Sequence, residues 1–161
     1  MTASIFLKLD GVEGDSVKKG HDGEIDIVSW SWDMSQTGLA HVGKGAGGGK
    51  VMVGDVTLTK RIDSATPSLM MKCCKGDHIP LATVKVERAG GDSPLSYMVL
   101  TMEKVFITNV SPSIASGDPE GMESLSLNFE SFKIEIESQS ESGAGGGKSQ
   151  AGFNMATGEP A

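Results

Sequence analysis

The feature that most constrains the fold of this chain is a hydrophobic pattern with a period of two residues. In the segment EIDIVSWSWDM it places large apolar side chains on one strand face, namely Val28, Trp30, Trp32 and Met34. The opposite face then carries small or acidic side chains, namely Ser29, Ser31 and Asp33. Because successive side chains of a β-strand point to opposite faces, this pattern predicts a strand with a buried apolar face and a polar outer face. We expect the two tryptophans to fill the core, and the alternative is an exposed aromatic platform for a carbohydrate.

Further segments are rich in Val, Ile, Thr and aromatic residues, as strands are: SIFLKLDG, VMVGDVTLTK, LATVKVER, LSYMVLTMEKVFITNV and SLSLNFESFKIEIES. The last two are long, and the alternation changes phase within each. Met98, Leu100 and Met102 share one face, whereas Val105 and Ile107 lie on the other. A slip of one residue is what a β-bulge, or a strand that passes between two sheets, produces. The sequence therefore predicts an all-β domain with two sheets, arranged as a barrel or a sandwich.

One short helix is predicted among the strands. Thr66 suits the cap, Pro67 the first helical position and Gly76 the end, with SLMMKCCK in between. A helix of about nine residues is not stable alone, so we expect it to pack on the barrel.

Two glycine-rich segments interrupt the strand pattern. The hexapeptide GAGGGK occurs at 45–50 and again at 143–148. Such a glycine density cannot pack a core and loses much conformational entropy on ordering. We expect a single domain over residues 1–161, with a long extended loop at 38–50 and a flexible C-terminal segment at 143–161, in which only 152–154 dock as a short strand.

Charge and cysteine content exclude several classes of protein. A net charge of -7 and a pI of about 4.9 disfavour nucleic-acid binding, which requires clustered Lys and Arg. No segment approaches the roughly 18 apolar residues of a membrane span, and the N-terminus lacks the basic and apolar regions of a signal peptide. Cys73 and Cys74 are adjacent, so we do not expect an ordinary structural disulfide. We expect the chain to fold in a reducing compartment. We expect folding in the cytoplasm and any export to proceed without a cleaved signal.

No residue pattern predicts catalysis or a cofactor. The GGGK runs resemble a phosphate-binding loop, but Ser142 and Lys44 stand where that motif requires its first glycine. The histidines and cysteines lack the spacing of metal ligands. Glu135 and Glu137 share a strand face, which is better explained as a solvated outer face than as a paired-carboxylate site. We expect no enzymatic activity, no cofactor and no bound metal.

Five segments, in their order along the chain, resemble the haemolysin-coregulated proteins (Hcp) of bacterial type VI secretion. They are IFLKLDGVEGDS, GHDGEIDIVSWSWDMSQTG, TLTKRIDSATPSLM, KVFITNVSPS and SLNFESFKIE, and the match extends from Ile5 to about Asn154. The resemblance implies a small two-sheet β-barrel with one flanking helix, related in architecture to phage tail-tube proteins. It also implies homohexameric rings with heterologous contacts, which stack into a tube inside a contractile sheath and hold effectors in the bore before export.

The resemblance also implies roles for particular residues. Polar side chains opposite the tryptophans would line the bore and contact effectors, with Ser31 foremost and Ser29 and Asp33 beside it. The loop at 38–50 would be the arm that reaches an adjacent ring, through His41, Val42, Gly43, Lys44, Gly45, Ala46 and Gly47. The implied partners are further copies of this chain, effectors, and sheath and spike or baseplate proteins, with no nucleic acid and no membrane insertion. The protein would be cytoplasmic before assembly and extracellular after contraction.

Two other interpretations stay open at this point. A monomeric ligand- or carbohydrate-binding β-barrel would use Trp30 and Trp32, and blue-shifted tryptophan fluorescence that sugars leave unchanged would argue against it. A phage-like tail-tube protein outside secretion would form the same ring, and genomic neighbours would separate it from a secretion protein.

Overall fold

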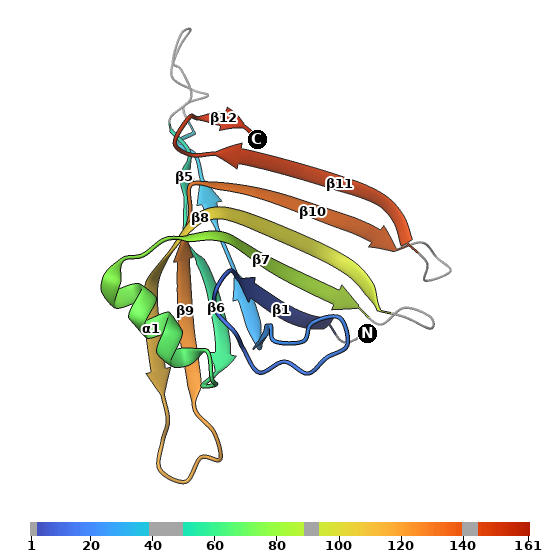
Figure 1. Ribbon diagram of the computed structural model, residues 1–161. Coiled ribbons are helices and arrows are strands. Elements are labelled where there is room, and N and C mark those ends of the chain that lie inside the picture. Colours follow the sequence, from blue (N-terminus) through green and yellow to red (C-terminus); the bar gives the residue numbers. More distant parts are fainter. Residues whose placement is uncertain (1–2, 39–49, 89–93, 140–144) are drawn as a thin grey trace, which may run out of the picture.

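The computed structural model describes residues 3–38, 50–88, 94–139 and 145–161, which form strands and one helix (Figure 1). The elements in these ranges are β1 (Ala3–Leu9), β2 (Ile25–Ile27), β3 (Ser29–Ser31), β4 (Met34–Ser35), β5 (Met52–Val53), β6 (Val56–Arg61), α1 (Thr66–Lys75), β7 (Ile79–Arg88), β8 (Leu95–Ser113), β9 (Met122–Asn128), β10 (Ser131–Gln139), β11 (Gly145–Asn154) and β12 (Glu159–Pro160).

Apart from β4 and β5, which pair with each other, the strands form two antiparallel sheets that share β8. The first sheet has the strand order β12-β11-β10-β8-β7-β1-β2, and the second has the order β3-β6-β9-β8. The first part of β8 pairs with β7 and β10, and the part from Phe106 to Ser113 pairs with β9. Lys104, at this transition, has a φ of 51°. The predicted strand that changes phase between two sheets is therefore confirmed in β8, whereas the other long segment divides into β9 and β10.

The core lies between the two sheets and under α1. Leu7, Leu58, Leu100 and Leu125 are completely buried there, and Leu69 of the helix joins them. Burial of each such side chain contributes about 1.5–3 kcal/mol. The helix ends at Gly76, whose φ of 67° favours glycine, as the sequence predicts. The fold is thus mostly β with one helix, as expected from the alternation.

The predicted cap at Thr66 is wrong. Ala65 precedes the helix and offers no side-chain cap, while Thr66 is the first helical residue. The Thr66 hydroxyl instead donates a hydrogen bond of 2.6 Å to Glu123 Oε2 inside the protein. A buried acceptor therefore engages the hydroxyl that a helix cap would have used.

The predicted burial of the apolar strand face is correct for its two tryptophans and wrong for the residues at its two ends. Trp30 and Trp32 are partly buried and pack against the core, but Val28 and Met34 are 47% and 49% exposed. The reason for Val28 is a change of phase between β2 and β3, because Ile25 and Ile27 are buried whereas Trp30 is the next residue that packs on the core. Met34 belongs to the β4–β5 pair, which lies outside the two main sheets.

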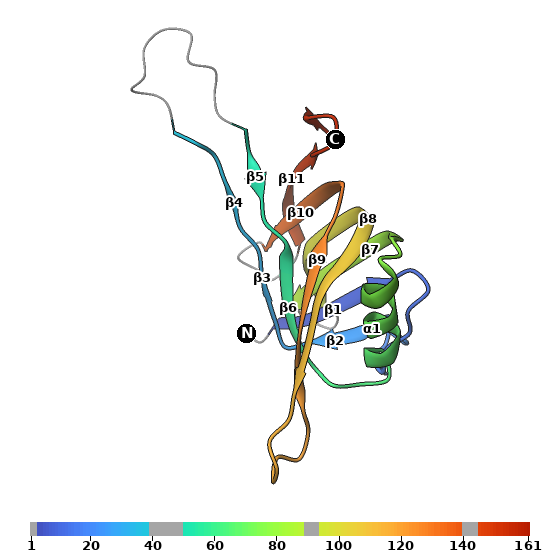
Figure 2. The same ribbon diagram turned by 90° about the vertical axis from the view of Figure 1, so that its left-hand side faces the viewer.

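The C-terminal segment also differs from the expectation of a flexible tail. β11 begins at Gly145 and pairs with β10 as far as Asn154, and β12 then pairs with the end of β11. Glycines take part because the strand ladder uses only backbone N–H and C=O groups, and the edge of β10 supplies the partner groups. Residues 39–49, which include the expected ring-contact positions 41–47, lie outside the described residues; β4 and β5 pair beside them (Figure 2).

Candidate assembly and lining surfaces

Neutral polar side chains cover the outer face of the second sheet in two rows that cross all four strands. The strand register places four of them in one row: Ser29, Thr59, Ser124 and Ser111. The neighbouring row contains Ser31, Thr57, Ser126 and Asn109. Between these rows, on the opposite face, lies an apolar row: Trp30, Leu58, Leu125 and Val110. The period-two pattern of β3 therefore continues across the entire sheet.

Burial follows the same alternation. Leu58 and Leu125 are completely buried, whereas Ser29 and Ser31 are exposed and the facing Thr59 and Thr57 of β6 are partly exposed. Hydroxyl groups both donate and accept hydrogen bonds and carry no charge at neutral pH. We call these eight residues, the two rows defined above, the hydroxyl face.

Charged groups lie only at the ends of the hydroxyl face. At one end Asp55 accepts hydrogen bonds from Thr108 Oγ1 (2.6 Å) and Asn128 Nδ2 (2.9 Å). At the other end Arg61 pairs with Glu120 at 3.1 Å. The eight central residues are Ser, Thr and Asn, so this face can form hydrogen bonds without strong attraction to either sign of charge.

The predicted lining residues divide between two places. Ser29 and Ser31 lie in separate rows of the hydroxyl face, as their alternation with Trp30 requires. Asp33 is exposed but lies beyond β3, where its backbone carbonyl accepts a hydrogen bond from Gly54 N (2.9 Å) at the base of the β4–β5 pair. The structure thus brings Ser29 and Ser31 onto one surface and places Asp33 after the end of β3, beside Gly54.

Sequence reasoning missed the other six members of the hydroxyl face. They come from the segments VTLTK, NVSPS and SLSLN, each of which alternates polar with apolar residues as β3 does. That alternation was a usable signal for the orientation of each side chain. It carried no information on which strands are neighbours, because Ser29 and Ser124 are brought together only by the sheet order.

Both lateral edges of the second sheet lack a partner strand within the described ranges. β3 pairs only with β6, and the part of β8 from Phe106 to Ser113 pairs only with β9. Beside the first edge, the Trp30 indole N–H is buried and has no hydrogen-bond partner among the described residues. Exposed sheet edges present backbone donors and acceptors for pairing with another chain.

The tryptophans do not form an exposed platform. Trp32 donates its indole N–H to the Gly54 carbonyl at 2.9 Å, and its ring meets Phe132 edge-on with centroids 4.7 Å apart. Trp30 faces the core beside Leu58. These contacts explain the two rings as packing groups and leave the carbohydrate interpretation without a site.

A buried ion-pair cluster ties the second sheet to the start of the helix. Lys60 Nζ lies 3.0 Å from Glu123 Oε2 and 2.9 Å from Asp63 Oδ1, and it also donates to Thr66 Oγ1 at 3.3 Å. Lys60 and Glu123 are 0% and 1% exposed. The sequence held a signal here, because Lys60 shares the buried strand face of Val56 and Leu58.

A second polar cluster holds the segment before β2 on the first sheet. The His21 ring stacks on Phe6 with centroids 3.9 Å apart, and its nitrogens contact Glu24 (3.0 Å) and Glu87. Burial lowers the pKa of His21, but the hydrogen bonds to the two carboxylates outweigh burial and raise this pKa above its usual value. His21 therefore behaves as a bridge between acidic groups.

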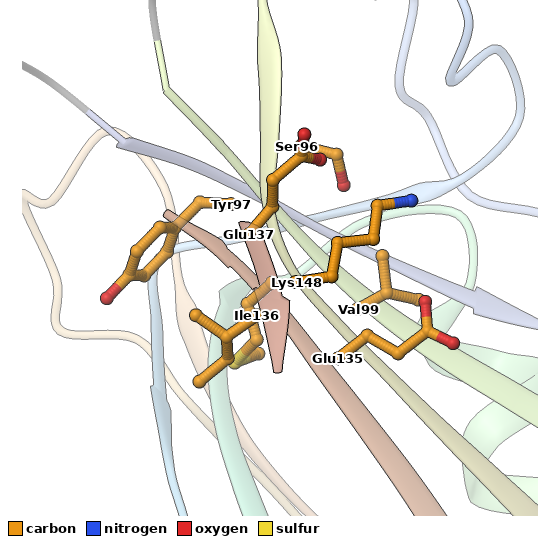
Figure 3. Close-up of a pocket in the computed structure, with 8 residues that line it drawn as sticks. Ser96, Tyr97, Val99, Glu135, Ile136, Glu137 and Lys148 are labelled. Carbon is orange, nitrogen blue, oxygen red and sulfur yellow. The ribbon is translucent and has the colours of Figure 1, made fainter. Parts of the chain in front are cut away.

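The paired glutamates line only a small depression (Figure 3). Glu135 and Glu137 lie on β10, Lys148 comes from β11 opposite Glu137, and Lys133 pairs with Glu135 at 3.4 Å. The cavity of about 70 Å³ is far smaller than a typical ligand pocket of roughly 300–1,000 Å³. This arrangement fits a solvated strand face with alternating charges.

Two further observations concern metals and membranes. Within the described ranges, no three His, Cys, Asp or Glu side chains gather where they could hold a metal ion. The helix seen in this part of the chain lacks the length and apolarity needed to span a bilayer.

Comparison with known proteins gives a consistent result. Residues 6–136 match the family model described as "Type VI secretion system effector, Hcp". Protein hcp1 of Pseudomonas aeruginosa is 39% identical over 135 residues, which cover 84% of this chain and 83% of that protein. The crystal structure of Hcp1 from Salmonella typhimurium is 33% identical with a TM-score of 0.83 over 100% of both chains. Hcp2 from the same organism is 31% identical with a TM-score of 0.73, covering 97% of this chain and 98% of its own.

Proposed function

The chain belongs to the Hcp family of type VI secretion system proteins, and from this premise we propose that it forms hexameric rings that stack into the inner tube of that system. The observation that carries the proposal is the second sheet, which has a continuous hydroxyl face and two edges without a partner strand among the described residues. Pairing the β3 edge of one subunit with the β8 edge of the next would be a heterologous contact, and such contacts close into a ring when the rotation fits.

In such a ring the hydroxyl face would line the bore. Ser31 and Ser29 would project from the strand next to the subunit boundary, and Asp33 would lie nearer the β4–β5 pair. A wall of small neutral hydroxyls can form many weak hydrogen bonds, which would hold an effector protein without binding it irreversibly. We propose that this surface carries effectors during assembly and export.

The remaining partners follow from the same function. The sheath would surround the stacked rings, the spike and baseplate proteins would meet the tube at its end, and the segment at 38–50 would reach an adjacent ring. The subunit would be cytoplasmic until the sheath contracts and extracellular afterwards. Its role would be structural, with effectors as cargo.

The first experiment measures the mass of the purified protein by light scattering after size exclusion. We expect about six times 16.8 kDa, and a monomer at high protein concentration would contradict the ring. Val28→Lys places a charge beside the β3 edge and should lower the mass toward the monomer. Val17→Lys is a matched control, because Val17 is 90% exposed and lies in the segment before β2, away from both edges of the second sheet.

A second experiment tests the lining. Ser31→Gln should leave the ring mass unchanged but reduce the amount of a co-expressed effector that co-purifies, because a larger side chain projects from the hydroxyl face. Ser68→Gln provides the control, since Ser68 is exposed on α1 outside the sheets. Equal effector recovery with the unmodified protein, Ser31→Gln and Ser68→Gln would refute the assignment of Ser31 to the bore.

A further inference from the structure

An apolar groove lies where the β4–β5 pair meets the turn between β11 and β12. Its volume is about 520 Å³, and its lining includes Met34, Val53, Phe132, Phe153 and Met155. Met34 is 49% exposed in the single chain. An exposed apolar groove is a candidate surface for contact with another molecule.

A second apolar cluster lies at the opposite end of the molecule. The turn between β8 and β9 carries Ile114, which is 62% exposed, and Ile62 is 38% exposed. Ile62 N donates to the Gly121 carbonyl at 3.0 Å, and a Cβ on Gly121 would contact both isoleucine side chains. The isoleucines therefore form one patch over Gly121. Figures 1 and 2 both place this turn at the far end of the chain from β5 and β12.

We propose that the groove of one subunit receives the Ile62–Ile114 patch of a second copy of this chain in the next ring. The inference rests on the proposed tube, and it assigns the residues of the contact between rings. Two unlike surfaces at opposite ends of one chain can join head to tail, and a contact of that kind repeats along a line instead of closing on itself.

The charges around the two surfaces favour the same orientation. Lys50 lines the groove, and the β8–β9 turn carries Asp118 and Glu120. Glu120 already pairs with Arg61 in an exposed ion pair, which solvent screens, and Asp118 has no ion pair among the described residues. Approach of the turn would therefore bring an unpaired carboxylate toward Lys50. The apolar contact would provide affinity, and the charges would fix the direction of approach.

The test uses rings of the full chain and measures stacking separately from ring formation. Ile114→Asp and Met34→Asp each place a charge in the proposed contact, and both sites are exposed enough to tolerate one. Each variant should keep the ring mass but require at least about tenfold more protein to form stacked tubes in electron micrographs. Combining Ile114→Asp with Met34→Lys should restore stacking, because the two new charges would face each other. Val17→Asp is the control.

Three outcomes would overturn the proposal: normal stacking of both single variants, failure of the charge pair to restore stacking, or loss of the ring itself with Ile114→Asp. A cross-linking arm separates this failure from failure of the ring. With Cys73 and Cys74 replaced by Ser, Ile114→Cys together with Met34→Cys should give a ladder of oligomers on oxidation, and either new cysteine alone should not. A ladder from a protein that is monomeric by light scattering would refute the hexameric ring but support the proposed contact between copies. The absence of a ladder from intact rings would refute the proposed contact but leave the hexameric ring supported.

Discussion

The buried amine of Lys60 offers a direct test of how the second sheet is joined to helix α1. Lys60→Met keeps the length and most of the volume of the side chain but removes the charge. Glu123 would then retain only the 2.6 Å hydrogen bond from Thr66, and its second oxygen already lacks a partner among the described residues. The substitution would thus leave a fully buried carboxylate with little compensation.

The expected loss is large because the pair is deeply buried. Removing one partner of a buried ion pair typically destabilises a protein by about 3–5 kcal/mol, since the other charge stays desolvated. Replacing both charges is far less harmful, because apolar groups of similar volume need no partner. We therefore expect Lys60→Met to lose about 3 kcal/mol or more, and Lys60→Met with Glu123→Leu to recover most of that loss.

Guanidinium denaturation monitored by tryptophan fluorescence would measure both variants. The protein concentration must be the same in every titration, because assembly stabilises the folded chain. Lys133→Met is the matched control, since Lys133 is 52% exposed and should change stability by less than about 0.5 kcal/mol. If Lys60→Met lost no more than this control, or if the double variant were less stable than the single one, the reasoning from the buried pair would be wrong.

Three further predictions concern other parts of the fold. The pKa of His21 is raised in the folded protein, so the contribution of His21 to stability is fully present below the unfolded pKa of about 6.5 and is lost as pH rises through the folded pKa. The difference in the free energy of unfolding between wild type and His21→Asn should therefore shrink as pH increases in that window, and a constant difference would contradict this. Gly76→Ala should destabilise by about 1 kcal/mol because φ is 67°, and Gly76→Asn by less, as thermal unfolding would measure. Thr59→Val should leave the free energy of unfolding within about 0.5 kcal/mol, whereas Leu58→Ala should cost about 2–5 kcal/mol, because the two neighbours face opposite sides of the sheet.

Much of the fold was predictable because the alternation acts locally. It identified the exposed face of Ser29 and Ser31, the inward side of Trp30 and the phase change in β8, and the sequence also predicted the helix end at Gly76. Five ordered segments pointed to the family. Each of these features depends on residues that are close together in the chain, where side-chain direction and turn chemistry decide the outcome.

What could not be predicted depends on contacts between distant segments. The Lys60–Glu123 pair and the hydroxyl face both require β6 to lie beside β9, which no local pattern specifies. The pairing of β11 was missed because glycine-rich sequence argues against order, and only the available edge of β10 reverses that preference. The exposure of Val28 follows from the change of phase between β2 and β3, and that of Met34 from the separate β4–β5 pair, neither of which the regular alternation of the sequence specifies.

The second phase change in β8 shows how one residue determines the composition of the hydroxyl face. Ile107 and Val110 both face the core, although a regular strand would place residues three apart on opposite faces. The register shift between Ile107 and Asn109 resolves this conflict, because Thr108 is accommodated as an extra residue. Its hydroxyl bonds to Asp55 Oδ2 and to the Ser126 carbonyl, which holds the bulge in place. If Thr108 were instead paired in a regular strand without the bulge, the side chains after Ile107 would point to the opposite faces. Val110 would then lie on the polar side of the sheet in place of Asn109 and Ser111.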